Sequence, residues 1–253
     1  MTFDWTAGRW VPASWQSISA DGLRYAYVDV IPDSSEPLRN RTPVHVVDVT
    51  TGSDRVVHDG GSLAILDFAQ QGIFLTQVTY GFSEGALKVF LLNPDTGAFT
   101  TVLGTDRPFV DGAGGGAAWT VDDAPGTTSF TQYRLIGDRL SRVDINGQIT
   151  PWFVLPSMDV FLIGFDLEGH PIVAAANANS FEVWIAYGPS SAVRLYEGPA
   201  NASPNGIGFS TAIPDGPHGI WFSTSRGVYL YTATQGMKLV ATGLTGFVSG
   251  TCG

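Results

Sequence analysis

Short runs of apolar side chains follow one another along the chain, and most of them end in a polar turn that contains glycine. Residues 24–30 and 44–49 are examples, rich in aromatic and β-branched side chains that alternate with other types. Alternation of this kind is typical of β-strands, in which successive side chains point to opposite faces of a sheet. The pattern therefore predicts a chain built of many short strands.

The glycine turns recur at a nearly fixed spacing. They are separated by 44, 45, 50, 41 and 48 residues and are centred on Gly8, Gly52, Gly97, Gly147, Gly188 and Gly236. A period in this range indicates a repeat architecture, and one unit of this size cannot bury its apolar face alone. The strand-rich units favour the blades of a β-propeller over helical repeats.

Each unit is expected to hold four strands, A to D, that run from a central channel to the rim. The first unit comprises residues 15–20, 24–30, 44–49 and 55–58, and the second comprises 63–69, 73–78, 87–92 and 99–103. The fourth comprises 160–166, 171–175, 181–187 and 193–196, and the fifth comprises 206–213, 220–223, 227–232 and 237–241. Asp or Asn followed by Gly in the connecting turns favours hairpin geometry.

The third unit can be placed in two ways. Residues 109–110 could open it, but the placement that keeps the turn glycines most regular has its strands at 117–121, 129–135, 139–145 and 148–154. This placement leaves residues 104–116 as a long glycine-rich loop, and Asp111 to Gly116 is interpreted as a linker between blades.

The two ends of the chain resemble parts of one more blade. Residues 2–12 are predicted to form a C–D hairpin, and residues 244–249 could supply the missing A strand. Joining both termini in one blade would remove an exposed sheet edge. We therefore expect a single all-β domain over 1–253, a six-bladed β-propeller of four-stranded antiparallel blades, with a five-bladed propeller as the alternative.

Two segments resemble the blade motifs of known propellers. Residues 15–27 (WQSISADGLRYAY) resemble the S-x-D-G-x-x-I-A-Y blade of TolB-like six-bladed propellers. Residues 213–224 (IPDGPHGIWFST) are similar to the D-G-x-I-W-F blade of NHL-type, streptogramin-lyase-type and two-component-regulator propellers. The resemblance implies a propeller over almost the whole chain, and TolB-type propellers serve as protein-interaction modules in the cell envelope. It implies no particular activity.

Charge and hydropathy limit the partners. The net charge is −10, from 23 acidic and 13 basic residues, and Lys and Arg never cluster, so a nucleic-acid partner is not expected. No apolar stretch of about 18 residues occurs that could span a membrane. The chain as given shows no signal peptide, so the periplasmic or extracellular location that we expect would require an export signal upstream. Cys252 is the single cysteine and cannot form an internal disulfide. We expect a monomer.

Candidate binding residues gather in the D–A connections between successive blades, which meet around one mouth of the channel in a propeller. Carboxylates there could hold a cationic group, and Arg107 could grip a carboxylate or phosphate. The predicted site consists of His58, Asp59, Asp106, Arg107, Asp111, Asp159 and Asn205. No His-x-His, Cys-x-x-Cys or His-Glu-x-x-His spacing occurs, so neither a metal site nor a cofactor is expected.

The leading interpretation is a non-enzymatic propeller that binds a protein or a small molecule at this mouth, as part of a bacterial exported protein. The alternative is a lyase or hydrolase in the channel that uses His58, Asp106 and Asp159 as acid–base or metal-binding groups, which requires the three side chains to converge on one reacting atom. A third possibility is a structural sensor whose N-terminal hairpin, with Trp5 and Trp10, docks on a neighbour.

Overall fold

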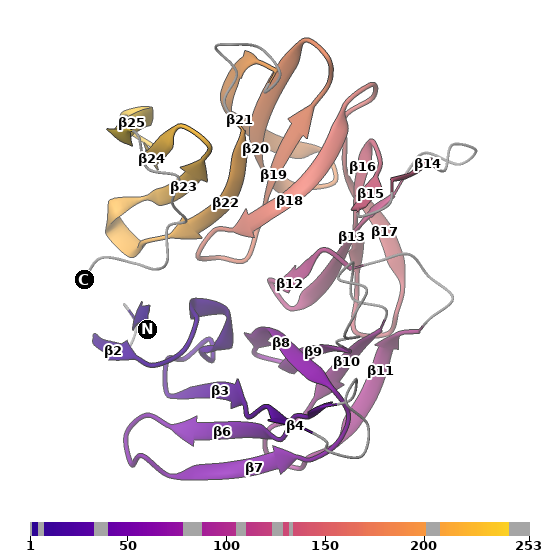
Figure 1. The fold of residues 1–253 in the computed structure, drawn as a ribbon, viewed down its shortest axis with the longest axis vertical. Helices are drawn as coiled ribbons and strands as arrows, with labels where there is room; N and C mark the ends of the chain where they lie inside the picture. The colour runs from indigo at the N-terminus through magenta and orange to yellow at the C-terminus, as the bar shows by residue number, and fades with distance from the viewer. Residues whose placement is uncertain are drawn as a thin grey trace.

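The computed structural model describes residues 2–4, 8–32, 40–77, 88–104, 110–122, 129–131, 134–200 and 208–242. These residues form an almost entirely β-structure, in which the helical elements are two single turns of 3-10 helix, η1 (Trp15–Ser17) and η2 (Gly216–His218). Figure 1 shows sheets that follow one another around a common centre, each with its first strand innermost. No helix among the described residues is long and apolar enough to cross a membrane.

The second, fourth and fifth predicted units are confirmed as four-stranded antiparallel sheets with consecutive strand order. The second contains β8 (Leu63–Ala69), β9 (Gly72–Gln77), β10 (Val89–Leu92) and β11 (Phe99–Leu103). The fourth contains β18 (Asp159–Phe165), β19 (Pro171–Ala176), β20 (Ser180–Gly188) and β21 (Ser191–Pro199), and the fifth contains β22 (Phe209–Pro214), β23 (Ile220–Thr224), β24 (Gly227–Thr232) and β25 (Gly236–Thr242). A parallel bridge between Gly164 and Ala212 joins the innermost strands of the last two sheets.

The first unit has three main strands, β3 (Arg24–Val28), β6 (Val44–Asp48) and β7 (Asp54–His58), with a short hairpin of β4 (Ile31–Pro32) and β5 (Asn40–Arg41). The inner strand predicted at 15–20 is wrong, because this segment forms η1 and a single bridge from Ile18 to Tyr25. Ser19 Oγ donates to Asp21 and to the Arg24 carbonyl, and the Ser17 N–H donates to the Ser14 carbonyl. Such local bonds compete with a strand ladder.

The favoured placement of the third unit is also wrong. Its inner strand is β12 (Gly112–Gly114), followed by β13 (Ala117–Asp122), β16 (Arg139–Val143) and β17 (Ile149–Val154), while β14 (Ser129–Thr131) and β15 (Arg134–Ile136) form a separate hairpin. The segment interpreted as a linker is therefore the inner hairpin. A Cβ at Gly114 would lie 2.6 Å from Cδ1 of Phe165, so glycine lets the neighbouring ring pack directly on this strand.

The N-terminal hairpin is confirmed as β1 (Thr2–Asp4) paired with β2 (Arg9–Val11). Val11 is buried, and Arg9 Nη1 donates to the Val49 carbonyl oxygen at 2.9 Å, which ties the hairpin to the first sheet. The strand predicted at 244–249 lies outside the described residues.

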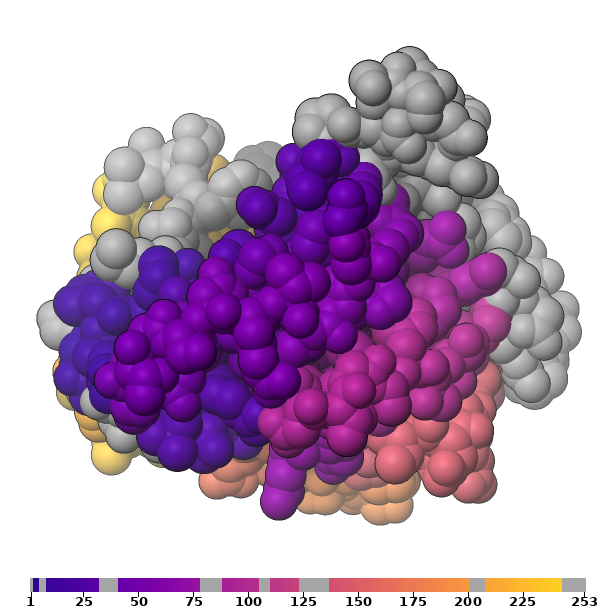
Figure 2. All heavy atoms as spheres, turned by 90° about the horizontal axis from the view of Figure 1, so that it is seen from below, coloured from indigo at the N-terminus to yellow at the C-terminus, as the bar shows by residue number. Residues whose placement is uncertain are grey.

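The apolar core lies between neighbouring sheets. Four clusters of buried side chains join the first sheet to the second, the second to the third, the third to the fourth and the fourth to the fifth. Figure 2 shows this succession from below, with the early sheets as adjoining bands from indigo to magenta. The second, third and fourth sheets are thus buried on both faces, which fixes their innermost strands and the turns between strands relative to one another.

Candidate functional site

Two of the predicted site residues serve contacts between strands. Asp59 accepts two N–H groups of Arg41, and this ion pair lowers the pKa of Asp59. The ring of His58 stacks on Phe99 with 4.3 Å between ring centroids and 10° between planes. Both side chains are therefore engaged by neighbouring residues at the end of β7.

Asp111 and Asp159 belong to strand ladders. Asp111 Oδ2 accepts the N–H of Val121 at 2.9 Å, and the Asp111 N–H donates to the Trp119 carbonyl at 2.8 Å, so this residue holds the start of the inner hairpin. Asp159 is exposed and opens β18 opposite Ala176.

The remaining members of the predicted site, Asp106, Arg107 and Asn205, lie outside the described residues, so their convergence stays a prediction. In the part of the chain that the structure describes, no three His, Cys, Asp or Glu side chains come together as a metal site would require.

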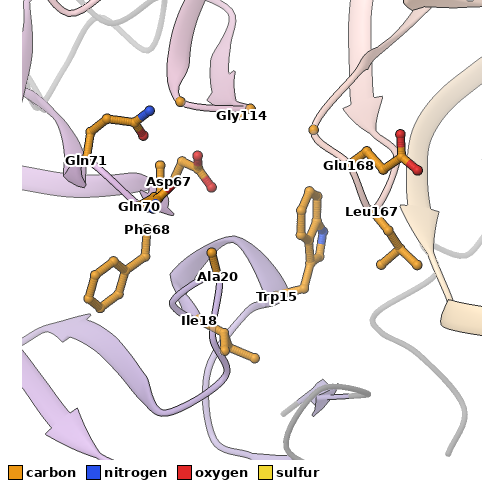
Figure 3. Close-up of a pocket in the computed structure, with 14 residues that line it drawn as sticks. Trp15, Ile18, Ala20, Asp67, Phe68, Gln70, Gln71, Gly114, Leu167 and Glu168 are labelled. Carbon is orange, nitrogen blue, oxygen red and sulfur yellow. The ribbon is translucent and has the colours of Figure 1, made fainter.

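A cavity of about 330 Å³ lies at the opposite ends of the inner strands, where the A–B turns meet η1 (Figure 3). The turns of the second, third and fourth sheets form its walls together with η1. Its side chains and backbone come from Trp15, Ile18, Ala20, Asp67, Phe68, Ala69, Gln70, Gln71, Gly114, Gly115, Gly116, Leu167, Glu168 and Gly169. Within the described ranges of the chain, the lining includes no Lys, Arg or His. We call it the turn cavity.

Asp67 is the buried polar group of the turn cavity. The register of β8 against β9 shifts between Ile65 and Asp67, and this bulge precedes a carboxyl that is only 8% exposed. Bulges of this kind redirect side chains near functional sites. Figure 3 shows the Asp67 carboxylate directed toward the space between the Gly114 turn and Trp15.

Burial raises the pKa of Asp67 to about 7, and the hydrogen bond from the Phe68 backbone N–H opposes this shift only in part. The physical cause is the loss of hydration of the charged form. Asp67 has no ion pair within the described chain. It is therefore a carboxyl that ionises near neutral pH with no counter-charge beside it.

Close backbone contacts between glycines form one wall of the turn cavity. A Cβ at Gly169 would lie 2.4 Å from the Gly115 nitrogen, and a Cβ at Gly115 would lie 2.6 Å from the Gly169 carbonyl oxygen. A Cβ at Gly116 would lie 2.6 Å from Oε1 of Gln71, so the Gln71 amide rests on the same turn. The turns of the second, third and fourth sheets thus meet without intervening side chains.

Trp15 forms the facing wall. Its indole packs against the core cluster between the third and fourth sheets, and Figure 3 shows it standing between Asp67 and the Leu167–Glu168 turn. The carboxylate of Glu168 points away from the cavity. An aromatic side chain and a buried carboxyl therefore border one cavity, whose lining also includes Gln70 and Gln71.

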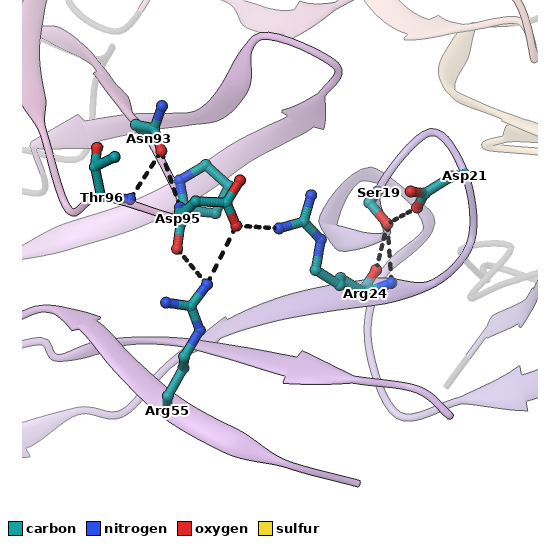
Figure 4. A network of polar contacts seen from close by, with 8 residues as sticks. Ser19, Asp21, Arg24, Arg55, Asn93, Asp95 and Thr96 are labelled. Atoms are coloured by element: carbon teal, nitrogen blue, oxygen red, sulfur yellow. Dashed lines mark hydrogen bonds and ion pairs between the residues drawn. The ribbon is translucent and has the colours of Figure 1, made fainter. Parts of the chain in front are cut away.

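A second cavity, of about 350 Å³, shares the wall formed by Ala20 and residues 68–71. Its charged groups are paired: Arg24 Nη1 lies 2.8 Å from Asp95 Oδ1, and Arg55 Nη2 donates to the Pro94 carbonyl at 2.6 Å (Figure 4). The guanidinium of Arg24 also lies 5.6 Å from the ring centroid of Phe68. Arg24 and Arg55 thus share the carboxylate of Asp95 as their counter-charge.

The turn cavity was not predicted, because the candidate residues lay in the D–A connections at the other mouth of the ring. One signal was available, since Asp67 is the single charged residue in an otherwise apolar inner strand. The partners of Asp67 could not be found in this way. They depend on η1 replacing a predicted strand and on the glycine segment forming the inner hairpin.

Comparisons with protein-family models and with curated protein sequences give no match. Solved structures do match. The β-propeller domain of the Trilobed protease from Pyrococcus furiosus aligns with 89% of this chain and 70% of its own, with a TM-score of 0.54 and 13% identity. The chain has a β-propeller fold.

Two peptidases share this propeller fold. An acylaminoacyl peptidase aligns with 91% of the chain at a TM-score of 0.52 and 10% identity, and prolyl oligopeptidase B from Galerina marginata aligns with 90% at 0.50 and 12%. This chain spans only 39% and 34% of the length of these two proteins. At such identities the likeness concerns the propeller alone and gives no activity.

Proposed function

We propose that this propeller is a non-enzymatic binding module that takes a small molecule in the turn cavity. The observation that carries the proposal is the carboxyl of Asp67, which is buried at the cavity wall and has no counter-charge within the described chain. Burying such a group costs stability, and a bound ligand that hydrogen-bonds it would recover part of this cost. The volume of the cavity, about 330 Å³, suits a small ligand.

We also propose that the ring has six blades, one of them built from both termini. The N-terminal hairpin supports this arrangement because β1 and β2 have the form of a C–D pair. The Trilobed protease propeller, which this chain resembles in fold, has an open velcro topology, so closure by strand pairing is the point to test. Removal of residues 243–253 should lower the melting temperature if they complete that blade, and an unchanged melting temperature would favour five blades.

The predicted D–A mouth, the extracytoplasmic location and the monomeric state remain predictions. A lyase or hydrolase built on His58, Asp106 and Asp159 also remains a prediction, and the described residues add no observation in its favour. The TolB-like and NHL-type resemblances likewise rest on the two blade motifs alone.

The binding role can be tested by following the indole N–H resonance of Trp15, assigned with a Trp15→Phe variant. Four probes would be added separately: choline, 3,3-dimethyl-1-butanol, 3,3-dimethylbutanoate and glucose. The first three share one shape and differ in charge. The proposal expects at least one probe to shift this resonance in a saturable way.

A blocking variant and a matched control decide where the probe binds. Ala20 is exposed and lines the turn cavity, so Ala20→Trp should fill the entrance and abolish the shift. Ala233 is an exposed residue of the β24–β25 turn outside the cavity lining, so Ala233→Trp should leave binding unchanged. Absence of any saturable shift from all four probes would overturn the proposed function.

A further inference from the structure

The turn cavity has one sign of charge. Among the described residues, its two titratable side chains, Asp67 and Glu168, are both acidic, and none that lines it is basic. Arg24, on the neighbouring strand β3, lies 5.6 Å from the ring centroid of Phe68 and pairs with Asp95. An anionic ligand would meet the buried Asp67 carboxylate without any compensating charge, and the two like charges would repel each other.

The aromatic wall adds a second requirement. Trp15 stands across the space from the Asp67 carboxylate (Figure 3). The face of an indole ring carries negative electrostatic potential and attracts ammonium and guanidinium groups, most strongly when water is excluded. A carboxylate and an indole that border one cavity therefore select the same ligand chemistry from two sides.

We infer that the turn cavity binds an organic cation, a quaternary or protonated amine of small size, between the Asp67 carboxylate and the Trp15 indole. This inference rests on the proposed function and names its ligand class. The cation supplies the counter-charge that Asp67 lacks, while its carbon substituents replace water against Trp15 and Leu167. The amides of Gln70 and Gln71 at the rim can accept hydrogen bonds from N–H groups of a primary amine.

The protonation state of Asp67 sets the pH dependence of this binding. The elements packed against β8 near Asp67 carry few charges: η1, β9 and β12 have no titratable side chain, and β3 contributes Arg24, Tyr25 and Tyr27. The β18–β19 turn contributes Glu168 to the cavity lining, and its Asp166 and His170 pair with each other. Because burial raises the pKa of Asp67 to about 7, the carboxylate forms as pH rises from 6 to 8. The affinity for a permanently charged cation should rise about tenfold over this interval.

The decisive experiment compares choline with 3,3-dimethyl-1-butanol, which replaces the quaternary nitrogen by carbon, and with 3,3-dimethylbutanoate. Affinities would be measured by calorimetry and by the Trp15 resonance at pH 6 and pH 8, with agmatine, which carries a primary ammonium and a guanidinium group, as a second cationic probe. We expect at least one of the two cations to bind at least about tenfold more tightly than the neutral and anionic isosteres at pH 8.

Two variants separate the contribution of the Asp67 carboxylate from that of other acidic side chains. Asp67→Asn should remove both the preference for the cation and its pH dependence, while keeping an acceptor for the Phe68 N–H. Glu197→Gln serves as a matched control, since Glu197 is an exposed carboxylate outside the cavity lining, and should change affinity by less than about threefold.

The outcomes distinguish the inference from the proposed function. If a neutral or anionic probe binds and Ala20→Trp abolishes that binding, while neither cation binds more tightly, the ligand class is wrong and the binding role stands. If no probe binds, both are overturned. If a cation binds equally well to Asp67→Asn and to the unmodified protein, the assignment to Asp67 is wrong.

Discussion

The inner strands β18 and β8 use the same register position in opposite ways. Each strand has a bulge, which is followed by Gly164–Phe165 in β18 and by Asp67–Phe68 in β8. Gly164 pairs with Ile172 on the next strand, and Asp67 pairs with Phe74. Gly164 lets β18 approach β22 closely enough for a parallel bridge to Ala212. Asp67 instead directs a carboxyl toward η1 and β12, and the turn cavity lies there.

The difference shows how one repeat position can serve either close packing between neighbouring sheets or the lining of a cavity. A Cβ at Gly164 would lie 2.3 Å from the Ala212 carbonyl oxygen, so any side chain there would separate the two strands. Beside Asp67, η1 takes the place of an inner strand of the first sheet and cannot form the same close ladder. A departure from the repeat thus leaves a space, and the buried carboxyl borders it.

The largest expected effect concerns the charge of Asp67. Its pKa is raised in the folded protein, so the folded state holds a proton that the unfolded state releases, and stability falls as pH rises from about 4 to about 7. Asp67→Asn removes this loss. Relative to the unmodified protein, the variant should gain about 4 kcal/mol between pH 4 and pH 8, as measured by urea unfolding.

Asp21→Asn provides a control of opposite sign. A hydrogen bond from Ser19 lowers the pKa of Asp21, so its charged form is favoured on folding and its contribution disappears as pH falls. The variant should therefore lose stability relative to the unmodified protein as pH rises. A constant stability difference between Asp67→Asn and the unmodified protein over this pH range would contradict the raised pKa of Asp67.

The close approach of β18 to β22 at Gly164 is tested next. Gly164→Ala should reduce the free energy of unfolding by about 2 kcal/mol because the new methyl group would overlap the Ala212 backbone. Gly188→Ala is the matched control, since no atom lies within 4 Å of the Cβ it would add. Equal melting temperatures for the two variants would mean that the fourth and fifth sheets are not in close contact at this point.

Gly115→Ala tests the backbone wall of the cavity. Gly115 has φ +62° and meets the Gly169 backbone, whereas Gly236 has φ +65° and open space around it. Both substitutions pay the cost of a left-handed conformation, so their difference isolates the contact. We expect Gly115→Ala to be less stable than Gly236→Ala by about 1 kcal/mol in thermal unfolding. Equal losses of stability in the two variants would show that the turns of the third and fourth sheets can move apart without cost.

The smallest effect is expected at the wall between the two cavities. Asp95→Asn removes the charge that Arg24 and Arg55 share, but the Asp95 side chain is 67% exposed. The loss of stability should therefore stay below about 1 kcal/mol and shrink in high salt. Choline titrations would show whether the turn cavity is independent of this network: an affinity change larger than about threefold would indicate coupling between the two cavities.

Strand alternation and turn glycines were sufficient to predict the second, fourth and fifth sheets and the N-terminal hairpin, because each of these elements follows the local period of its own sequence. The errors lie where local bonds or tertiary contacts overrule the pattern. At 15–20, η1 and local hydrogen bonds of Ser14, Ser17 and Ser19 replace the predicted strand. The glycines of β12 leave room for the ring of Phe165 to pack against this strand. The turn cavity depends on both departures, so the sequence indicated its carboxyl but not its surroundings.

The glycine turns that form one wall of the turn cavity limit how the proposed ligand selectivity can diverge. Gly114, Gly115, Gly116 and Gly169 offer ligands only their main chain, and added side chains there would collide with neighbouring atoms. Variation among relatives, or redesign in the laboratory, would therefore concentrate on η1 and the Gln70–Gln71 turn, where side chains can be exchanged without moving the ring.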